Sequence, residues 1–325
     1  MSALLIAQQA KNFWPSIVSE PHLIMHRENA VFRVQTTQGP AALRIHRVGY
    51  RQKSEVVSEL EWMAHLAVNG LELPAPIANC DGLLISEIEN ENRIAHVVDL
   101  LTWVKGTPLG RSNVPLAFSE PELQNIFQDV GRNLAWLHTL SDTWKRPATF
   151  QRHHLNKDGF LGEKPAWGKF WEATVLSINE KKLMKSVAQR AGEKLDTLSK
   201  AGADYGLIHA DLVRENIFVH EGKTSFIDFD DAGFGFRMFD LAVALVKNRE
   251  EPHYETIKAA LFEGYKSQRA ITSADQNSLN LFLALRDFAY LGWADARRGE
   301  PSMAPRIEKI KQDTLIAAEQ FLAGK

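Results

Sequence analysis

A short stretch with the alternation of β-strands lies within a region whose other segments have helical spacing. Residues 206–233 read GLIHADLVRENIFVHEGKTSFIDFDDAG. The pattern predicts two strands, Asn216–His220 and Thr224–Asp228, joined by a loop of Glu221, Gly222 and Lys223, because three-residue loops with a left-handed glycine are common in hairpins. Strands as well as helices must therefore build this half of the chain.

The open end of the predicted hairpin gathers three oxygen-bearing side chains. In this register Asn216 lies directly opposite Asp228, and opposed residues have Cβ atoms about 4.5–5.5 Å apart. Asp211 lies on the loop that enters the same end. Mg²⁺ takes oxygen ligands from one or two carboxylates and completes its shell with substrate phosphates and water. We therefore predict Asn216 and Asp228 as metal ligands and Asp211 as a proton acceptor. The alternative is an Asx-rich turn around an ordinary hairpin.

Composition excludes several classes of protein. The chain has 325 residues, of which 45% are hydrophobic and 24% charged, with a formal net charge of −2. These values exclude a disordered or fibrous protein and favour neither nucleic acid nor an anionic membrane surface as a partner. The single cysteine predicts a reducing, cytoplasmic location. The N-terminus has no basic region of a signal peptide, and no segment has the length of a membrane-spanning helix.

The pattern of the chain changes near Thr102–Gly106. Before it, strands are expected at Ala30–Thr36 and Ala41–His46, a helix at Ser54–Val68, and a further pair of strands near 83–85 and 94–101. After it, Ser119 and Glu122 form a capping-box pattern at the start of a long helix. Three later helices are expected near 254–268, 274–298 and 304–322. These segments predict a strand-rich first part and a helix-rich second part.

The loop before the hairpin resembles the catalytic loop of protein kinases. Protein kinases carry H-R-D-L-x-x-x-N and, further on, D-F-G. Here the loop runs from His209 through Asp211 to Asn216 and matches four of its five fixed residues, and Asp228-Phe-Asp230 follows. The sequence resembles the superfamily of aminoglycoside phosphotransferases, choline kinases and type II homoserine kinases. This resemblance implies an α+β, bilobal protein-kinase-like fold, with a small antiparallel-sheet nucleotide-binding lobe at 1–103 and a mainly helical catalytic and substrate lobe at 104–325.

The resemblance also implies roles for residues outside the hairpin. Asn29 lies in the segment similar to the nucleotide loop, and Arg44 occupies the strand whose cation binds nucleotide phosphates. Glu59 corresponds to the helix glutamate that pairs with that cation, with Glu55 as a rival. An arginine at position 44 replaces the lysine of protein kinases and brings a planar fork of donors. The remaining implied roles are adenine contacts from the backbone of Thr102 and Val104, a structural role for His209, and an N-cap or loop-bracing role for Asp240.

Several features of a regulated protein kinase are missing from the sequence. No glycine occurs between Pro21 and Gln38, so the glycine-rich loop is absent. There is no Ala-Pro-Glu triplet, and the interval from Asp228 to Asp240 leaves no room for a long activation loop. These features favour a kinase that acts on small molecules.

The predicted function is an ATP- and Mg²⁺-dependent phosphotransferase whose acceptor is a small molecule with a hydroxyl group and an amine. Asp230 and Asp231 could attract a second metal or a cationic acceptor, or could form a solvated acidic corner. Tyr290 and Trp293, at helical spacing, could form an apolar wall of the acceptor site or part of the core. A protein Ser/Thr kinase and a nucleotide-binding protein without turnover are the alternatives. The sequence leaves the acceptor and the oligomeric state open.

Overall fold

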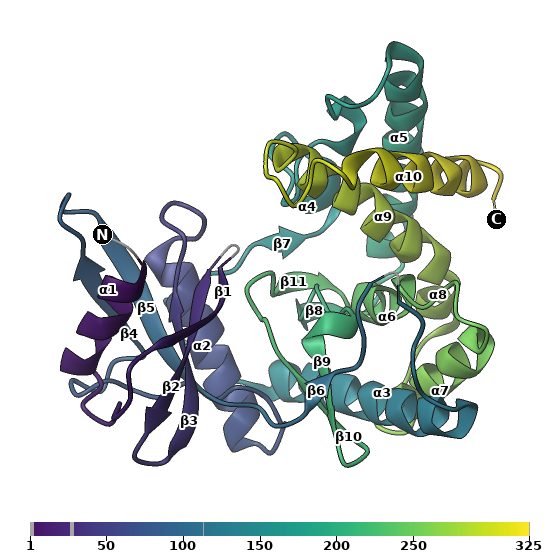
Figure 1. Cartoon of the computed structure of the whole chain (residues 1–325). Coiled ribbons are helices and arrows are strands. Elements are labelled where there is room, and N and C mark those ends of the chain that lie inside the picture. Colours follow the sequence, from purple (N-terminus) through teal and green to yellow (C-terminus); the bar gives the residue numbers. More distant parts are fainter. Residues whose placement is uncertain (1–2, 27–28, 113, 325) are drawn as a thin grey trace. The chain divides into compact units, whose positions relative to one another are not determined.

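The computed structural model describes residues 3–26, 29–112 and 114–324. The chain forms two compact units, whose elements are labelled in Figure 1. Unit 1 consists of Met1–Thr107, Thr143–Arg152 and Phe218–Asp230, and unit 2 contains the rest of the chain. Unit 1 thus takes two segments from beyond residue 104. The predicted division into functional lobes at 103 and 104 stays a prediction.

Unit 1 is built on a five-stranded antiparallel sheet with the order β1-β2-β3-β5-β4. β2 and β3 pair from Ala30 opposite Ile45 to Thr36 opposite Gly39, and β3 pairs with β5 so that Arg44 lies opposite Asp99. The strands are β1 (His22–His26), β2 (Ala30–Thr36), β3 (Gly39–Ile45), β4 (Ile85–Glu89) and β5 (Ala95–Thr102).

The two faces of this sheet have different partners. Ala30, Phe32 and Val34 alternate with more exposed residues along β2 and are at most 3% exposed. They share a hydrophobic cluster with Ile6 of α1 (Ala3–Gln9) and with Trp14. Side chains on a strand alternate between faces, so Arg44 points opposite to its neighbours Leu43 and Ile45. It pairs there with Glu59 of α2 (Lys53–Val68), whose Val56, Leu60 and Met63 are buried.

The hairpin is present, with a shorter loop than the sequence analysis predicts. It consists of β9 (Ile217–His220) and β10 (Lys223–Phe226), and β9 also pairs with β6 (Thr107–Pro108). Only Glu221 and Gly222 connect the strands, with φ of 49° and 78°, which are the values of a type I′ turn. The predicted three-residue loop is therefore wrong, and the predicted register shifts by one residue. The strand predicted to end at Asp228 ends at Phe226.

Unit 2 is mainly helical and holds one small sheet of three strands in the order β7-β11-β8. β11 pairs with β8 so that Gly233 lies opposite Ile208 and Phe236 opposite Tyr205. The strands are β7 (His154–Leu155), β8 (Tyr205–Ile208) and β11 (Gly233–Phe236), and the helices are α3 (Glu120–Thr143, which ends at the boundary with unit 1), α4 (Lys157–Leu161), α5 (Ile178–Lys200), α6 (Arg237–Val246), α7 (Tyr254–Lys266), α8 (Ser273–Asn277), α9 (Leu279–Ala296) and α10 (Ile307–Leu322).

Two features of unit 2 differ from the sequence prediction. The helix expected at 274–298 is two helices, α8 and α9, which meet at Ser278. The hydroxyl of Ser278 donates to the carbonyl of Asp275, and this contact ends α8. The long helix α5 was not predicted, although Ser177 and Glu180 form a capping box at its start. Within the described ranges, no helix is long and apolar enough to span a membrane.

Candidate active site

The predicted catalytic loop follows β8 and belongs to unit 2. Ala210 has φ of 67°, a left-handed value that is uncommon for a residue with a side chain. A 3₁₀ turn, Arg214–Asn216, closes the loop. Such backbone values persist only where the surroundings enforce them, and they cluster at functional sites.

Asp240 of α6 enforces this conformation. Its carboxylate accepts hydrogen bonds from the backbone N–H groups of His209 at 2.8 Å and Ala210 at 2.7 Å. Nε2 of His138 lies 3.0 Å from the same carboxylate, and Nδ1 of His138 lies 2.8 Å from the Tyr265 hydroxyl. Burial raises the pKa of Asp240 to about 6, against the lowering effect of its backbone donors. The loop is therefore held by a buried carboxylate from another element.

The position of Asp240 decides between its two predicted roles. α6 begins at Arg237 with Phe236 as its N-cap residue, so Asp240 is not an N-cap. The N-cap alternative is wrong because Asp240 lies within the first turn of the helix, three residues after Arg237.

Both carboxylate oxygens of Asp211 have partners. Nδ2 of Asn216 donates to Oδ2 of Asp211 at 3.0 Å and to its backbone carbonyl at 2.8 Å. Nη2 of Arg286, from α9, donates to Oδ1 at 2.5 Å. Burial raises the pKa of Asp211 to about 7; Arg286 opposes the rise, and the nearby carboxylates Asp231 and Glu215 add to it. Unit 2 therefore presents an oriented carboxylate whose protonation changes near neutral pH.

Aromatic side chains lie next to the arginine that binds this carboxylate. The Arg286 guanidinium is 5.9 Å from the ring centroids of both Trp167 and Tyr290. Nε1 of Trp167 donates to the carboxylate of Asp231 at 3.3 Å. Tyr290 stacks on Trp293 with 5.5 Å between ring centroids. Arg286 therefore links Tyr290 to Asp211. Through Trp167, it also links Asp231 to the same surroundings.

Unit 1 contains a buried charge cluster around Arg44. Nη1 of Arg44 donates to Glu59 at 3.0 Å, so the predicted pair is present. Nε and Nη2 both donate to Asp99 at 2.9 Å. The rival carboxylate Glu55 accepts instead from the backbone N–H of Gln52, in the capping box of α2. Arg44 therefore forms ion pairs with two carboxylates, Glu59 and Asp99. The sequence analysis predicted only the pair with Glu59.

Opposing effects set the ionisation of this cluster. Burial alone would raise the pKa of Asp99, but Arg44 and His46, whose Nε2 lies 2.6 Å away, hold it below its usual value. Burial likewise works against the charge of Arg44, and Asp99 and Glu59 overcome it and raise the pKa of the guanidinium. Asp99 and Arg44 are therefore both charged at neutral pH.

A second buried arginine joins this cluster to the segment that carries Asp228. Nη1 of Arg152 lies 3.5 Å from Glu59, and Nη2 donates to the backbone carbonyls of Phe229 at 3.3 Å and Asp230 at 2.5 Å. Asp228 is exposed and has φ of 66°, whereas the Asp230 residue is 6% exposed. Asp228, like Ala210, thus has a left-handed backbone away from any hairpin turn.

The residues expected to contact the nucleotide lie along the same sheet. Oδ1 of Asn29 accepts from the Arg47 N–H at 3.4 Å; its neighbours 27 and 28, also part of the predicted nucleotide loop, lie outside the described residues. Thr102 ends β5, and its hydroxyl accepts from the Ala75 N–H at 2.8 Å. The N–H of Val104 makes no hydrogen bond within the described part of the chain.

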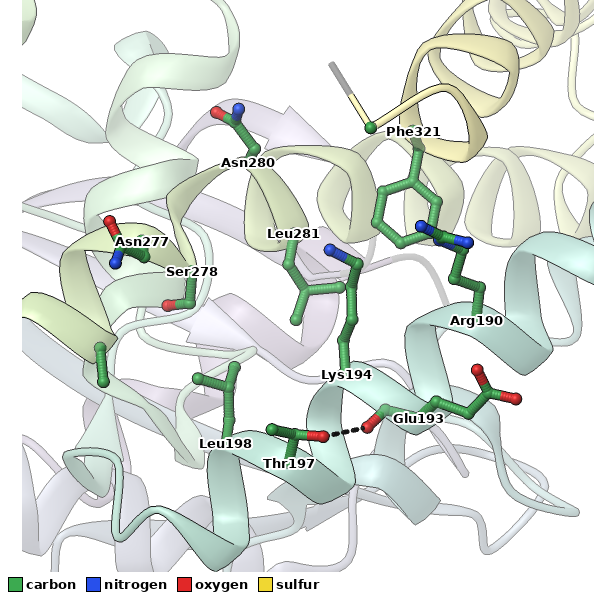
Figure 2. Close-up of a pocket in the computed structure, with 12 residues that line it drawn as sticks. Arg190, Glu193, Lys194, Thr197, Leu198, Asn277, Ser278, Asn280, Leu281 and Phe321 are labelled. Carbon is green, nitrogen blue, oxygen red and sulfur yellow. Dashed lines mark hydrogen bonds between the residues drawn. The ribbon is translucent and has the colours of Figure 1, made fainter.

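A cavity of about 590 Å³ lies in another part of unit 2, between α5, the start of α9 and the end of α10. Figure 2 shows Arg190 and Lys194 of α5 beside Phe321 of α10. None of the residues predicted from the sequence lines it. Among the residues that the structure describes, no group of three or more His, Cys, Asp or Glu side chains could hold a metal ion.

Comparisons with known proteins support the same kinase-like interpretation as this geometry. Residues 24–274 match the model of the phosphotransferase enzyme family. The chain belongs to this family. The predicted family resemblance, the α+β kinase-like fold and the classification as a small-molecule phosphotransferase are thereby confirmed.

Characterised relatives have several acceptors. A homoserine kinase of Rhizobium johnstonii is 27% identical, over 78% of this chain and 72% of its own. An amicoumacin kinase of Bacillus subtilis is 24% identical, over 67% of this chain and 60% of its own. The solved structure of a microcompartment-associated aminopropanol kinase is 28% identical, covers 98% of both chains and has a TM-score of 0.83.

The pKa of Asp211 predicts a pH dependence for the phosphoryl transfer expected of this family. A proton-accepting carboxylate works only when it is ionised, so activity is retained above its pKa and lost as the pH falls through it. We expect kcat/KM to decline toward acid with a midpoint at about pH 7 or, where a bound cation adds positive charge, somewhat lower. A pH profile measured with saturating ATP checks this. A rate that is flat down to pH 5 would exclude Asp211 as the titrating group.

Proposed function

We propose that this protein is an ATP-dependent phosphotransferase that moves the γ-phosphate to a hydroxyl group of a small, amine-bearing molecule. Family membership supports the reaction class. The observation that carries the proposal is the placement of Asp211, which follows the left-handed Ala210 and whose carboxylate is oriented by Asn216 and Arg286. In phosphoryl transfer the protein contributes mainly positioning and charge, and a loop aspartate orients the attacking hydroxyl and accepts its proton.

The remaining predicted residues receive supporting roles. Arg44, paired with Glu59, and Asn29 would act on the nucleotide phosphates. The Thr102 carbonyl and the Val104 N–H would contact the adenine, and the lack of a partner for Val104 within the described residues supports this. His209 and Asp240 would hold the catalytic loop, as their contacts with it suggest.

We further propose that Asn216 and Asp228 provide the protein ligands of Mg²⁺. The contact of Asn216 in unit 2 and the exposure of Asp228 in unit 1 support this. Nδ2 of Asn216 donates to Asp211, so Oδ1 is the atom of this side chain that would bind the metal. Asp228 is exposed on a left-handed backbone. One amide and one carboxylate oxygen suit Mg²⁺, which takes its other ligands from phosphates and water and would neutralise charge on the transferring group.

Replacement of Asp228 by alanine tests the metal assignment. The variant removes the charged ligand, so we expect ATP turnover to fall at least 100-fold at millimolar Mg²⁺. Calorimetry should also show that Mg²⁺ no longer strengthens the binding of a non-hydrolysable ATP analogue. Replacement of exposed Glu221 by alanine, in the hairpin that precedes Asp228, serves as the matched control. Undiminished magnesium-dependent binding in Asp228→Ala would rule out this ligand.

Asp231 is the proposed contact for the acceptor's amine. It is half-buried, is held by Trp167 and lies close enough to Asp211 to raise the pKa of that carboxylate. Asp230 is the more buried of the two, so we propose only a supporting role for it at the acceptor site. Tyr290 and Trp293 would form the apolar wall. The single, exposed Cys80 supports a cytoplasmic location for the enzyme.

ATP consumption measured against a panel of amino alcohols, hydroxy amino acids, choline, aminoglycosides and casein tests the proposal. We expect stimulation by at least one small hydroxyl compound and none by casein. Stimulation by casein alone would identify a protein kinase. Nucleotide binding without stimulation by any compound would identify a binding protein without turnover.

A further inference from the structure

Two cations meet at Tyr290, on the side of the site that carries Asp211. Nζ of Lys247, at the C-terminal end of α6, lies 4.4 Å from the Tyr290 ring centroid, and the Arg286 guanidinium lies 5.9 Å from the same centroid. The hydroxyl of Tyr290 accepts from Arg306 at 2.7 Å, and its ring stacks on Trp293. The ring is therefore fixed at both its edge and its face, and the two cations lie on a rigid support.

The two cations have too few partners for their burial. Arg286 is 9% exposed, yet the described residues provide its guanidinium with one hydrogen-bonded partner, Asp211 through Nη2. Its Nε is enclosed without a hydrogen-bond partner, and its Nη1 also makes no hydrogen bond there. Leaving a buried charged donor unpaired is costly, so such groups are usually satisfied by an anion or by ordered water.

Lys247 has fewer partners than Arg286. No carboxylate in the described part of the chain lies within ion-pair distance of its ammonium group, which lies over the Tyr290 ring. The carboxylate of the nearby Asp287 accepts hydrogen bonds from Nη2 of Arg249, at 2.8 Å to Oδ1 and 2.7 Å to Oδ2. Both cations lie over the Tyr290 ring. Burial lowers the pKa of Lys247, the positive charge of Arg286 lowers it further, and Asp287 and Glu215 oppose this fall. Asp211 pairs with Arg286, so Lys247 is the cation that lacks an ion-pair partner among the described residues.

We propose that Lys247 and Arg286 form an oxyanion site beside Asp211 that binds a carboxylate group of the acceptor. The proposal rests on the phosphotransferase function and narrows its substrate class. Arg286 can keep its Nη2 on Asp211 and offer Nη1 to the ligand, because its donors form a planar fork. Lys247 contributes a point charge to the same group. Together with the amine proposed above for the acceptor, this carboxylate makes the acceptor class a small hydroxy amino acid.

Matched pairs of acceptors isolate the carboxylate. Serine and ethanolamine, threonine and isopropanolamine, and homoserine and propanolamine each differ only by that group. We expect the wild-type protein to favour the carboxylate-bearing member of at least one pair in kcat/KM, by about 10- to 100-fold, the usual worth of a hydrogen bond to a charged group. Lys247→Gln should reduce this preference about tenfold without changing the KM for ATP. Arg286→Gln should reduce the preference too, together with kcat for both members, because it also contacts Asp211.

Lys266→Gln is the matched control, since Lys266 also lies over an aromatic ring, Phe262 at 5.8 Å, but on α7. It should change neither the preference nor kcat. Phosphorylation of the amino alcohols without any preference for the carboxylate would overturn this inference and leave the proposed function standing. A rise in the KM for ATP in Lys247→Gln, in place of a lost preference, would assign the oxyanion site to a nucleotide phosphate.

A binding measurement keeps the inference testable even if no pair is turned over. Calorimetric titration should then show binding of homoserine, threonine or serine to the wild-type protein and at least tenfold weaker binding to Lys247→Gln. Equal binding by both proteins, or by neither, would overturn the assignment.

Discussion

Replacement of Asp211 by asparagine is expected to lower kcat by about 10²–10⁴-fold, the usual contribution of a positioned proton acceptor. The substitution keeps the shape of the side chain and removes its ability to accept a proton. The Kd for ATP should stay near the wild-type value, because no nucleotide contact is assigned to this residue. Steady-state kinetics on the best acceptor, together with calorimetric titration of ATP, measure both quantities.

Asp129→Asn is the matched control for this variant. Asp129 lies on α3 and pairs with Arg132 three residues further along the helix. Its replacement should leave kcat unchanged. If Asp211→Asn retained turnover close to that of this control, another group would have to accept the proton.

The second large effect is on stability. Replacement of Asp99 by asparagine should lower the free energy of unfolding by about 3–5 kcal/mol, the cost of breaking a buried ion pair by removing one partner. In the native cluster two arginines, Arg44 and Arg152, face two carboxylates, Asp99 and Glu59. Removing one charge leaves two buried guanidinium groups sharing Glu59.

Urea unfolding followed by circular dichroism measures this loss. Glu87→Gln is the matched control in the same sheet, because Glu87 pairs with Lys53 at the surface and should contribute no more than about 1 kcal/mol. Equal losses in the two variants would mean that the buried cluster does not stabilise unit 1.

The cluster also explains why position 44 carries arginine. A guanidinium presents donors along two edges, so Arg44 binds Asp99 through Nε and Nη2 while Nη1 binds Glu59. The compact ammonium of a lysine lacks that planar fork. The departure from the lysine of protein kinases is therefore matched by Asp99, which lies directly opposite Arg44 in the sheet.

Local pattern predicted the parts of the site that lie close together in sequence. The loop from His209 to Asn216 and the hairpin after it could be identified because their residues follow one another at fixed spacing. The length of the hairpin loop could not, because it depended on Glu221 accepting a left-handed backbone that residues with side chains usually avoid. The missed helix α5 did carry a local signal, the capping box of Ser177 and Glu180.

The residues that were missed act across long sequence separations. Asp99 interrupts an apolar strand, which signals a buried charge, but its partner follows only from the pairing of β3 with β5. Arg152 lies in an irregular segment with no motif, and it joins Glu59 to the backbone beside Asp228. Arg286 precedes Tyr290 and Trp293 at helical spacing on α9, and only the packing of that helix brings it to Asp211. Sequence periodicity indicates which side of a helix is buried. It does not indicate which other elements pack against that side.

Identification of the phosphorylated product tests the central claim most directly. The wild-type protein would be incubated with ATP, Mg²⁺ and the best acceptor of the panel, and phosphorus NMR would follow the fate of the γ-phosphate. The account predicts a phosphomonoester of the acceptor that forms in step with ADP and does not form with Asp211→Asn. Release of the γ-phosphate as inorganic phosphate alone, or its appearance on protein, would contradict it.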